Sequence, residues 1–281
     1  MRKTYKLAIG GAFPRSESGR SYEVTAADGT FLANAARASR KDARDAVVAA
    51  RKAFPGWSGR TAYNRGQVVY RIAEVLEGRR VQFVEEVRRA EGLSVGDAEA
   101  AVDASVDRLV WYAGWADKVA QVMGATNPVA APYFDFSLPE PTGVVAVLAP
   151  AGSSLLGLVS VVAPVVVMGN TCVVTASPER PLPAVTFAEV LSTSDVPGGG
   201  VNVLTGPLAD TAPTLASHMD VNGIDLTGAG ELAAALELAA ADNLKRVRRV
   251  AGSPEDWYAE PGLERITWAL ETKTVWHPVG I

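Results

Sequence analysis

Gly143-Val144-Val145-Ala146-Val147-Leu148-Ala149-Pro150 opens the stretch that decides the fold, and Asp225-Leu226-Thr227-Gly228-Ala229-Gly230 closes it before an alanine-rich segment. Between them, apolar runs of strand length alternate with segments of helical length. This alternation is typical of βαβ units and predicts a parallel sheet buried on both faces. The predicted strands are 144–148, 172–175, 201–204 and 223–226, and the predicted helices are 154–168, 182–191, 210–218 and 231–242.

The composition of the 281 residues excludes several classes of function. Hydrophobic residues make up 48% of the chain and the net charge is only -4, so neither nucleic acid nor an anionic membrane is an expected partner. No apolar run is long enough to span a bilayer, and the N-terminus lacks the apolar core of a signal peptide. With one cysteine and two histidines, we expect no disulfide, no metal site and a cytoplasmic location.

The N-terminal part is expected to be mostly helical after one short hairpin. Residues 6–24 predict the hairpin, as an edge element with a polar turn. Apolar residues at helical spacing then predict a helix over 41–54, capped by Ser39 and ended by Pro55-Gly56-Trp57. Further helices are predicted within 63–92, and a longer one over 95–122.

Two other segments are predicted to be exposed strands. Several prolines surround Tyr133-Phe134-Asp135-Phe136, whose alternation favours an exposed edge strand. The basic run Lys245-Arg246-Val247-Arg248-Arg249 could contact phosphate, but a solvated strand face is the favoured interpretation.

The order of these elements and several short phrases resemble the coenzyme domain of the aldehyde dehydrogenase superfamily. The N-terminal block matches through similar words as well. The resemblance implies a Rossmann-like α/β fold, with a parallel sheet flanked by helices, an N-terminal helical block and a small β oligomerisation arm. The phrases that carry it are Gly169-Asn170-Thr171, Val201-Asn202-Val203-Leu204-Thr205-Gly206, Ser217-His218-Met219-Asp220-Val221, Leu226-Thr227-Gly228, Ala50-Arg51-Lys52-Ala53-Phe54-Pro55-Gly56-Trp57 and Tyr112-Ala113-Gly114-Trp115-Ala116.

After Val250 the sequence no longer resembles the next part of a family member but resembles the family's C-terminal end. Gly262-Leu263-Glu264-Arg265 and the following strand, Leu270 to Trp276, look like the end of a family member, including its oligomerisation strand. This implies coenzyme-domain-like regions at 1–124 and 143–250, and an oligomerisation arm and terminal strand at 125–142 and 262–281. The family's catalytic domain is then expected to be absent.

The resemblance implies three catalytic residues, a nucleophile, a general base and an oxyanion donor, and the sequence supplies none of them. Aldehyde oxidation in the family needs a cysteine thiolate that attacks the carbonyl, but Cys172 lies in an apolar strand and is expected to be buried, protonated and inert. The glutamate base has no counterpart. Ala151-Gly152 stand where the oxyanion-stabilising asparagine would fall, and losing such a donor alone costs about 100- to 1000-fold in rate. We therefore assign no catalytic residue.

The resemblance also implies which positions would contact a coenzyme, but several of them hold residues unsuited to that contact. Thr175 replaces the ribose-binding lysine, Leu208 and Ala212 crowd a glycine-spaced turn, and Ala229 replaces a phosphate-contacting serine. No cofactor is expected, and NAD binding, if present, should be weak. The positions concerned are Ala149, Pro150, Thr175, Ser177, Glu179, Gly206, Thr227, Gly228 and Ala229.

These features favour a catalytically inactive, structural or regulatory subunit of a full-length aldehyde dehydrogenase. A homo-oligomer is the other possible assembly. Two alternatives of other kinds stay open: an NAD(P)-binding sensor, and an oxidoreductase component that is active only in complex. A chain without the catalytic domain is expected to expose apolar area that a partner covers. The interface is predicted at Tyr133, Phe134, Phe136, Thr272, Thr274, Val275 and Trp276.

Overall fold

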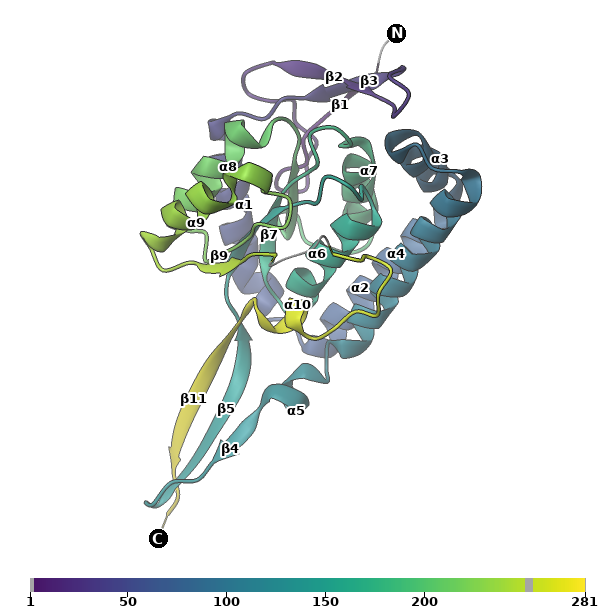
Figure 1. Ribbon diagram of the computed structural model, residues 1–281. Helices are drawn as coiled ribbons and strands as arrows, with labels where there is room; N and C mark the ends of the chain where they lie inside the picture. Colours follow the sequence, from purple (N-terminus) through teal and green to yellow (C-terminus); the bar gives the residue numbers. More distant parts are fainter. Residues whose placement is uncertain (1–2, 251–254, 281) are drawn as a thin grey trace.

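The computed structural model describes residues 3–250 and 255–280. At its centre lies a five-stranded parallel sheet in the order β10-β9-β6-β7-β8 (Figure 1). This confirms the predicted fold class. The strands are β6 (Val144–Leu148), β7 (Thr171–Thr175), β8 (Val201–Leu204), β9 (Gly223–Asp225) and β10 (Arg246–Arg248).

Helices cover both faces of the sheet because its strands alternate their side chains between two apolar cores. Val145 and Val147 of β6 join one core, whereas Val144, Ala146 and Leu148 join the other. The first core packs against α2 (Ala62–Gly78), α3 (Arg80–Glu91), α4 (Val95–Trp115), α6 (Leu156–Val167) and α7 (Leu182–Ser192). The second packs against α1 (Arg40–Ser58), α8 (Leu208–Ser217) and α9 (Ala233–Ala241), which follows the short 3-10 helix η1 (Gly230–Leu232).

The N-terminal hairpin predicted over 6–24 is wrong in its extent, because within that range only Ile9 and Ala12 form a tight antiparallel bridge, around Gly10-Gly11. Leu7 is fully buried and Ala8 bridges Val203 of β8, so this segment packs against the central sheet. The true hairpin joins β2 (Ser21–Thr25) to β3 (Phe31–Ala36), and β1 (Thr4–Tyr5) pairs with β3 on its other side. Its turn needs Gly29, whose φ is 83°. The alanine-rich β3 lacks the β-branched residues that mark a strand.

Two helix ends differ from their predicted positions. Ser39 caps α1 as expected, but the helix runs through Pro55 to Ser58. Trp57 explains the extension, since its ring is fully buried and its Nε1 donates to the carbonyl of Val166 at 2.9 Å. The predicted helix over 95–122 is interrupted, with α4 ending at Trp115 and a short α5 covering Val119–Met123.

An arm made of a second sheet projects from the body, with the C-terminal end of the chain at its tip (Figure 1). Its order is β11-β5-β4, where β5 is Tyr133–Pro141, β11 is Leu270–Pro278 and β4 is Ala125–Asn127. The prediction that Tyr133 to Phe136 form an edge strand is therefore wrong, because β5 lies between β4 and β11. The free edges belong to β11 and β4.

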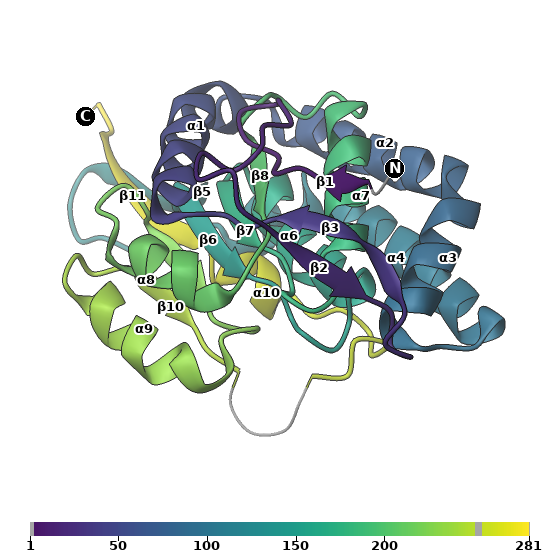
Figure 2. The same cartoon turned by 90° about the horizontal axis from the view of Figure 1, so that it is seen from above.

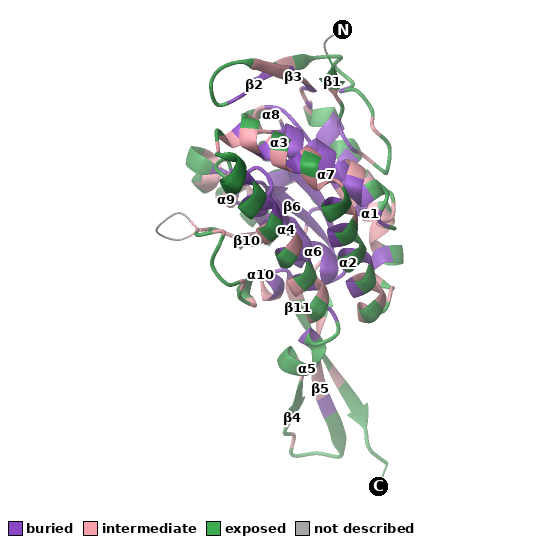
Figure 3. Ribbon diagram, turned by 90° about the vertical axis from the view of Figure 1, so that its right-hand side faces the viewer, coloured by how far each residue is buried: buried purple, intermediate pink, exposed green. Residues whose placement is uncertain are grey.

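The arm is held to the body near its base and is largely exposed beyond it. Arg246 of β10 pairs with Glu271 of β11, and the backbone N–H of Thr142 donates to the carbonyl of Ala269 at 3.3 Å. Figure 3 shows that burial is concentrated in the central sheet, whereas the arm is mostly exposed. Its exposed apolar side chains are Tyr133, Phe134, Leu138, Trp276 and Val279.

Within the described residues, none of the helices combines the length and apolar character needed to cross a membrane. Among the residues that the structure describes, no cluster of histidine, cysteine and carboxylate side chains could hold a metal ion.

Candidate coenzyme-binding face

The carboxyl edge of the central sheet holds the residues predicted to contact a coenzyme. After β6 the chain builds β7 and β8 on one side and then returns to place β9 on the other. Ligands of open α/β sheets bind at such a switch point, outside the carboxyl ends of the strands. Ala149 and Pro150 follow β6; Thr175, Ser177 and Glu179 end or follow β7; Gly206 follows β8; Thr227, Gly228 and Ala229 follow β9.

The turn after β9 uses its own backbone amides internally. The N–H of Thr227 donates to the Asp225 carboxylate at 2.9 Å, that of Gly228 to the carbonyl of Leu148 at 2.8 Å, and that of Ala229 to the carbonyl of Leu226 at 2.9 Å. A pyrophosphate bound at a helix N-terminus needs amides that point freely at it. These three amides already donate to acceptors within the protein, so they are not free to bind a pyrophosphate.

Most of the predicted positions at the ends of β7 and β8 are buried or closely packed, with Glu179 as the exception. Thr175 and Ser177 are buried, and their hydroxyl oxygens contact neither solvent nor a hydrogen-bond partner among the described residues. Gly206 packs so closely on Arg37 and Ala38 that a Cβ added to it would lie 3.3 Å from the Ala38 nitrogen. Glu179 is exposed.

The loop between β6 and α6 is fixed from two directions. Arg180 donates to the carbonyls of Ala151 and Gly152 at 3.2 and 2.9 Å. On the other side, Glu91 at the end of α3 accepts from the backbone N–H and the hydroxyl of Ser154, both at 2.6 Å. The carbonyls of residues 151 and 152 thus face a guanidinium, and neither residue offers the side-chain amide that an oxyanion site would need.

A segment that we call the strap, residues 255–269, runs along α6 from Trp257, near the carboxyl edge, to Ala269, which accepts from Thr142 and Asn170 at the opposite edge of the sheet. Ile266 and Ala269 within it are fully buried in the core shared with α6. The Trp257 ring lies on the first turn of α6, where a Cβ added to Gly157 would be 3.2 Å from the ring and 2.6 Å from Pro150. The Trp257 ring of the strap therefore covers the start of α6 beside Pro150.

Three arginines hold the strap in place through ion pairs, hydrogen bonds and a stacking contact. Arg265 stacks over Trp257, donates to Asp225 of β9 at 3.3 Å and also pairs with Glu255. Arg248 of β10 donates to Glu255 at 3.0 Å. From α4, Arg108 donates to the carbonyls of Trp257 and Ala259 at 2.7 and 3.0 Å.

Sequence reasoning missed this network, although it left one signal. Asp225 is a carboxylate inside the otherwise apolar run Gly223 to Leu226, and a buried charge of this kind requires a partner. The partner, Arg265, is forty residues away in the chain, so no local pattern connects the two.

Cys172 lies on β7 and is fully buried, as predicted. Burial in apolar surroundings raises the pKa of its thiol well above the usual range. The thiolate, which is the nucleophilic form, is thereby suppressed.

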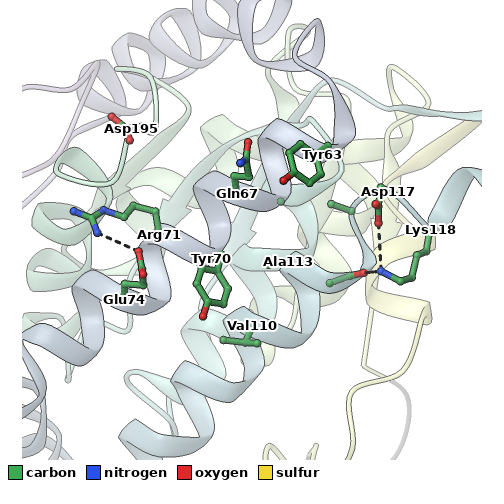
Figure 4. Close-up of a pocket in the computed structure, with 13 residues that line it drawn as sticks. Tyr63, Gln67, Tyr70, Arg71, Glu74, Val110, Ala113, Asp117, Lys118 and Asp195 are labelled. Atoms are coloured by element: carbon green, nitrogen blue, oxygen red, sulfur yellow. Dashed lines mark hydrogen bonds and ion pairs between the residues drawn. The ribbon is translucent and has the colours of Figure 1, made fainter.

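A further hollow lies away from the carboxyl edge, between α2 and α4 (Figure 4). Its volume is about 630 Å³. Tyr63, Gln67 and Tyr70 line it from α2 and Val110 lines it from α4. The predicted coenzyme positions do not line this hollow.

The fold and the carboxyl edge define a dinucleotide-binding type of α/β domain, and comparison with known proteins gives its family. Residues 13–256 match the aldehyde dehydrogenase family, to which the chain belongs. It is 31% identical over 258 residues to cytosolic aldehyde dehydrogenase 1 of Elephantulus edwardii, covering 88% of this chain and 50% of the relative. The chain thus spans about half the length of that relative.

Solved structures agree with this assignment. A putative aldehyde dehydrogenase from Burkholderia cenocepacia superposes with a TM-score of 0.83 at 28% identity, over 88% of this chain and 50% of the other. Betaine aldehyde dehydrogenase from Staphylococcus aureus, solved in complex with NAD+, has a TM-score of 0.82 at 24% identity, over 86% and 48%. At that identity the second likeness supports the fold alone.

Proposed function

We propose that the protein is a catalytically inactive member of the aldehyde dehydrogenase family that acts as a structural or regulatory subunit of a full-length, cytoplasmic aldehyde dehydrogenase. The observation that carries the proposal is the pairing of a coenzyme face whose turn amides are already hydrogen-bonded with an arm that is largely exposed. The chain uses internally the groups that would bind a coenzyme and leaves open the surface where another chain would bind.

The absence of catalysis is inferred from the state of each catalytic position. Cys172 is buried on a central strand, and the pKa of its thiol is raised. Ala151 and Gly152 supply no side-chain donor, and their carbonyls accept from Arg180. A family member that lacks the catalytic domain also lacks the glutamate base, so no step of aldehyde oxidation has a residue to perform it.

Weak coenzyme binding is inferred from the same face. Trp257 lies beside Pro150, and the amides of Thr227, Gly228 and Ala229 are already bonded. Binding a dinucleotide would require displacing the strap and breaking hydrogen bonds within the turn. An NAD(P)-binding sensor is the alternative that calorimetry with NAD would reveal, as micromolar affinity for the purified chain.

Assembly through the arm is inferred from its unpaired edge and its exposed aromatics. β11 pairs with β5 along one side only, so its other side presents backbone groups that can accept a strand from another chain. Trp276 is 57% exposed and Phe134 is 50% exposed. Burying such large apolar side chains against another chain would be favourable, which supports an interface on the arm.

The experiment on catalysis compares the purified wild-type chain with a Cys172→Ser variant. We expect neither protein to oxidise an aldehyde with NAD or NADP. Turnover by the wild type above that of the variant would disprove the inactive reading. If mixing with the partner creates an activity that the partner alone does not have, the chain is instead a component that is active only in complex.

The experiment on assembly co-expresses the chain with a full-length aldehyde dehydrogenase from the same cell. Native mass spectrometry should detect a hetero-oligomer, and deletion of residues 271–281 should abolish it. A wild-type chain that stays monomeric with every such enzyme, or a complex that survives the deletion, would refute the assembly proposal. A homo-oligomer lost upon the same deletion would replace the hetero-oligomer but keep the interface.

A further inference from the structure

The groove between α1 and α8 is a second candidate site, independent of the coenzyme face. The two helices lie side by side beneath the β2-β3 hairpin (Figures 1 and 2). Two hollows of about 510 and 270 Å³ run along their contact, and Arg40 lines both. Combined, their volume falls in the range of small-molecule sites, about 300 to 1000 Å³.

Positive charge is concentrated along this groove. Arg20 and Arg37 line the smaller hollow, and Arg44 lines the larger one. Arg37 is neutralised by Asp210, which it holds at 2.6 Å. Among the described residues, Arg20, Arg40 and Arg44 have no carboxylate in ion-pair contact.

This arrangement is unfavourable without an anion. Arg40 and Arg44 are four residues apart on α1, where like charges destabilise a helix by roughly 0.2 to 0.5 kcal/mol. Both are exposed at the groove, so neither is required for the core. Arg40 and Arg44 line the same hollow, and two planar guanidinium groups on one hollow are suited to bind phosphate oxygens.

A neutral donor and an apolar wall complete the larger hollow. The hydroxyl of Ser39, which lines the smaller hollow, already donates to Glu17 at 3.0 Å. At the far end, His218 accepts the backbone N–H of Asp220 on Nδ1, so in its neutral form it carries a donor proton on Nε2. Burial lowers the pKa of His218 and favours that form; the charge of Asp220 opposes the shift, and those of Lys245 and Arg44 assist it. Pro213 and Met219 add apolar surface to the larger hollow.

We propose that the groove between α1 and α8 binds a small phosphorylated molecule in its larger hollow, with its phosphate at Arg40 and Arg44 and its organic part against Pro213 and Met219. The unpaired arginines supply the affinity for phosphate, and the apolar wall selects for an organic body. Neither the arginines nor the apolar residues of the groove belong to the coenzyme face or to the arm. This proposal can therefore be tested independently of the proposed function.

The test measures binding of 1-naphthyl phosphate and of inorganic phosphate to the full chain by calorimetry. We expect the naphthyl ester to bind more tightly, because its ring buries apolar area on Met219. Arg40→Gln and Arg44→Gln should each weaken both ligands by about tenfold or more, since a charge-assisted hydrogen bond contributes about 1.5 to 3 kcal/mol. Met219→Ser should weaken only the ester.

Arg71→Gln is the matched control, because Arg71 is an exposed arginine of α2 whose partner is Glu74. Unchanged binding in this variant is expected. The proposal is overturned if neither ligand binds at millimolar concentration, if Arg71→Gln weakens binding as much as Arg40→Gln, or if a hexaglutamate peptide binds more tightly than both phosphates. The last outcome would make the groove a surface for acidic peptides.

Discussion

Arg265 and Asp225 form a buried ion pair that joins the C-terminal strap to the central sheet. The guanidinium donates to the carboxylate at 3.3 Å, and the side chains of the two residues are 10% and 0% exposed. Asp225 also accepts the backbone N–H of Thr227 at 2.9 Å. The same carboxylate therefore fixes the strap and shapes the turn in which a pyrophosphate would otherwise bind.

Replacing Arg265 by Met should destabilise the protein strongly. The substitution keeps an unbranched side chain over Trp257 but leaves Asp225 charged and buried, which costs about 3 to 5 kcal/mol. Urea unfolding should show this loss. Adding Asp225→Ala should recover part of it, because no buried charge then remains unpaired. Arg246→Met, which breaks the exposed pair with Glu271, should cost no more than about 1 kcal/mol; equal losses in the two arginine variants would contradict the argument.

The apolar strands of the central sheet could be predicted from the sequence because their cause is local. Val144 to Leu148 are all buried, and an uninterrupted apolar run of that length predicts such a strand. The β2-β3 hairpin escaped prediction because β3 is rich in alanine. The extension of α1 past Pro55 depends on Trp57 meeting Val166, a contact between distant parts of the chain.

The candidate site shows the same limit. Resemblance placed Thr227 to Ala229 at the carboxyl edge, which is where the structure has them. It could not reveal that their amides are already bonded, because the acceptors on Leu148 and Asp225 are set by how β6 and β9 lie side by side. The strap was missed because Arg108, Asp225 and Arg265 meet only in the folded chain.

The thiol of Cys172 should be almost unreactive in the native protein. Its side chain is fully buried, and burial raises the pKa of the thiol, so neither access nor thiolate is available. Alkylation by iodoacetamide at about pH 8, near the usual thiol pKa, should be negligible over the time in which a urea-unfolded sample reacts to completion. Comparable rates in the two samples would show that β7 opens readily or that the thiol is exposed.

Glu86 should make the protein less stable as the pH rises. Burial raises the pKa of this carboxyl, with hydrogen bonds from Gln82 and Thr186 opposing the shift. The folded state then holds the proton more tightly than the unfolded state, so the folded state is favoured at low pH. That contribution is lost as the pH rises from the unfolded pKa, about 4.3, through the folded one. Glu86→Gln should remove this part of the pH dependence.

Neighbouring Glu85 provides a control of opposite sign. Its pKa is lowered by the hydrogen bond and charge of Arg88, so its contribution to stability appears as the pH rises and is lost in acid. Denaturant unfolding should show Glu86→Gln departing from wild type above about pH 4.3 and Glu85→Gln departing below it, with slopes that differ from wild type in opposite directions. Parallel slopes would rule out the assignment to Glu86.

Millimolar NAD should hardly raise the melting temperature of the wild-type chain. A micromolar Kd would add about 4 kcal/mol of stability at that concentration, which a melting curve would reveal plainly. Because Trp257 covers the first turn of α6 beside Pro150, Trp257→Ala should allow a larger NAD-dependent shift than wild type. Trp276→Ala, on the arm, is the matched control and should behave as wild type does.

Trp276→Arg should weaken assembly through the arm without unfolding the chain. The indole is 57% exposed and meets the Tyr133 ring edge-on, with 5.8 Å between ring centroids, so its loss removes little from the core. In an interface, an arginine in its place would be an unpaired charge that costs about 2 to 5 kcal/mol, or roughly 30- to 4000-fold in Kd. Analytical ultracentrifugation should therefore show the variant dissociating at concentrations where wild type stays assembled. Met219→Arg places the same charge on a side chain of the body that is 72% exposed, and it should leave the oligomer intact. If both variants dissociate, or neither does, the arm around Trp276 is not the interface.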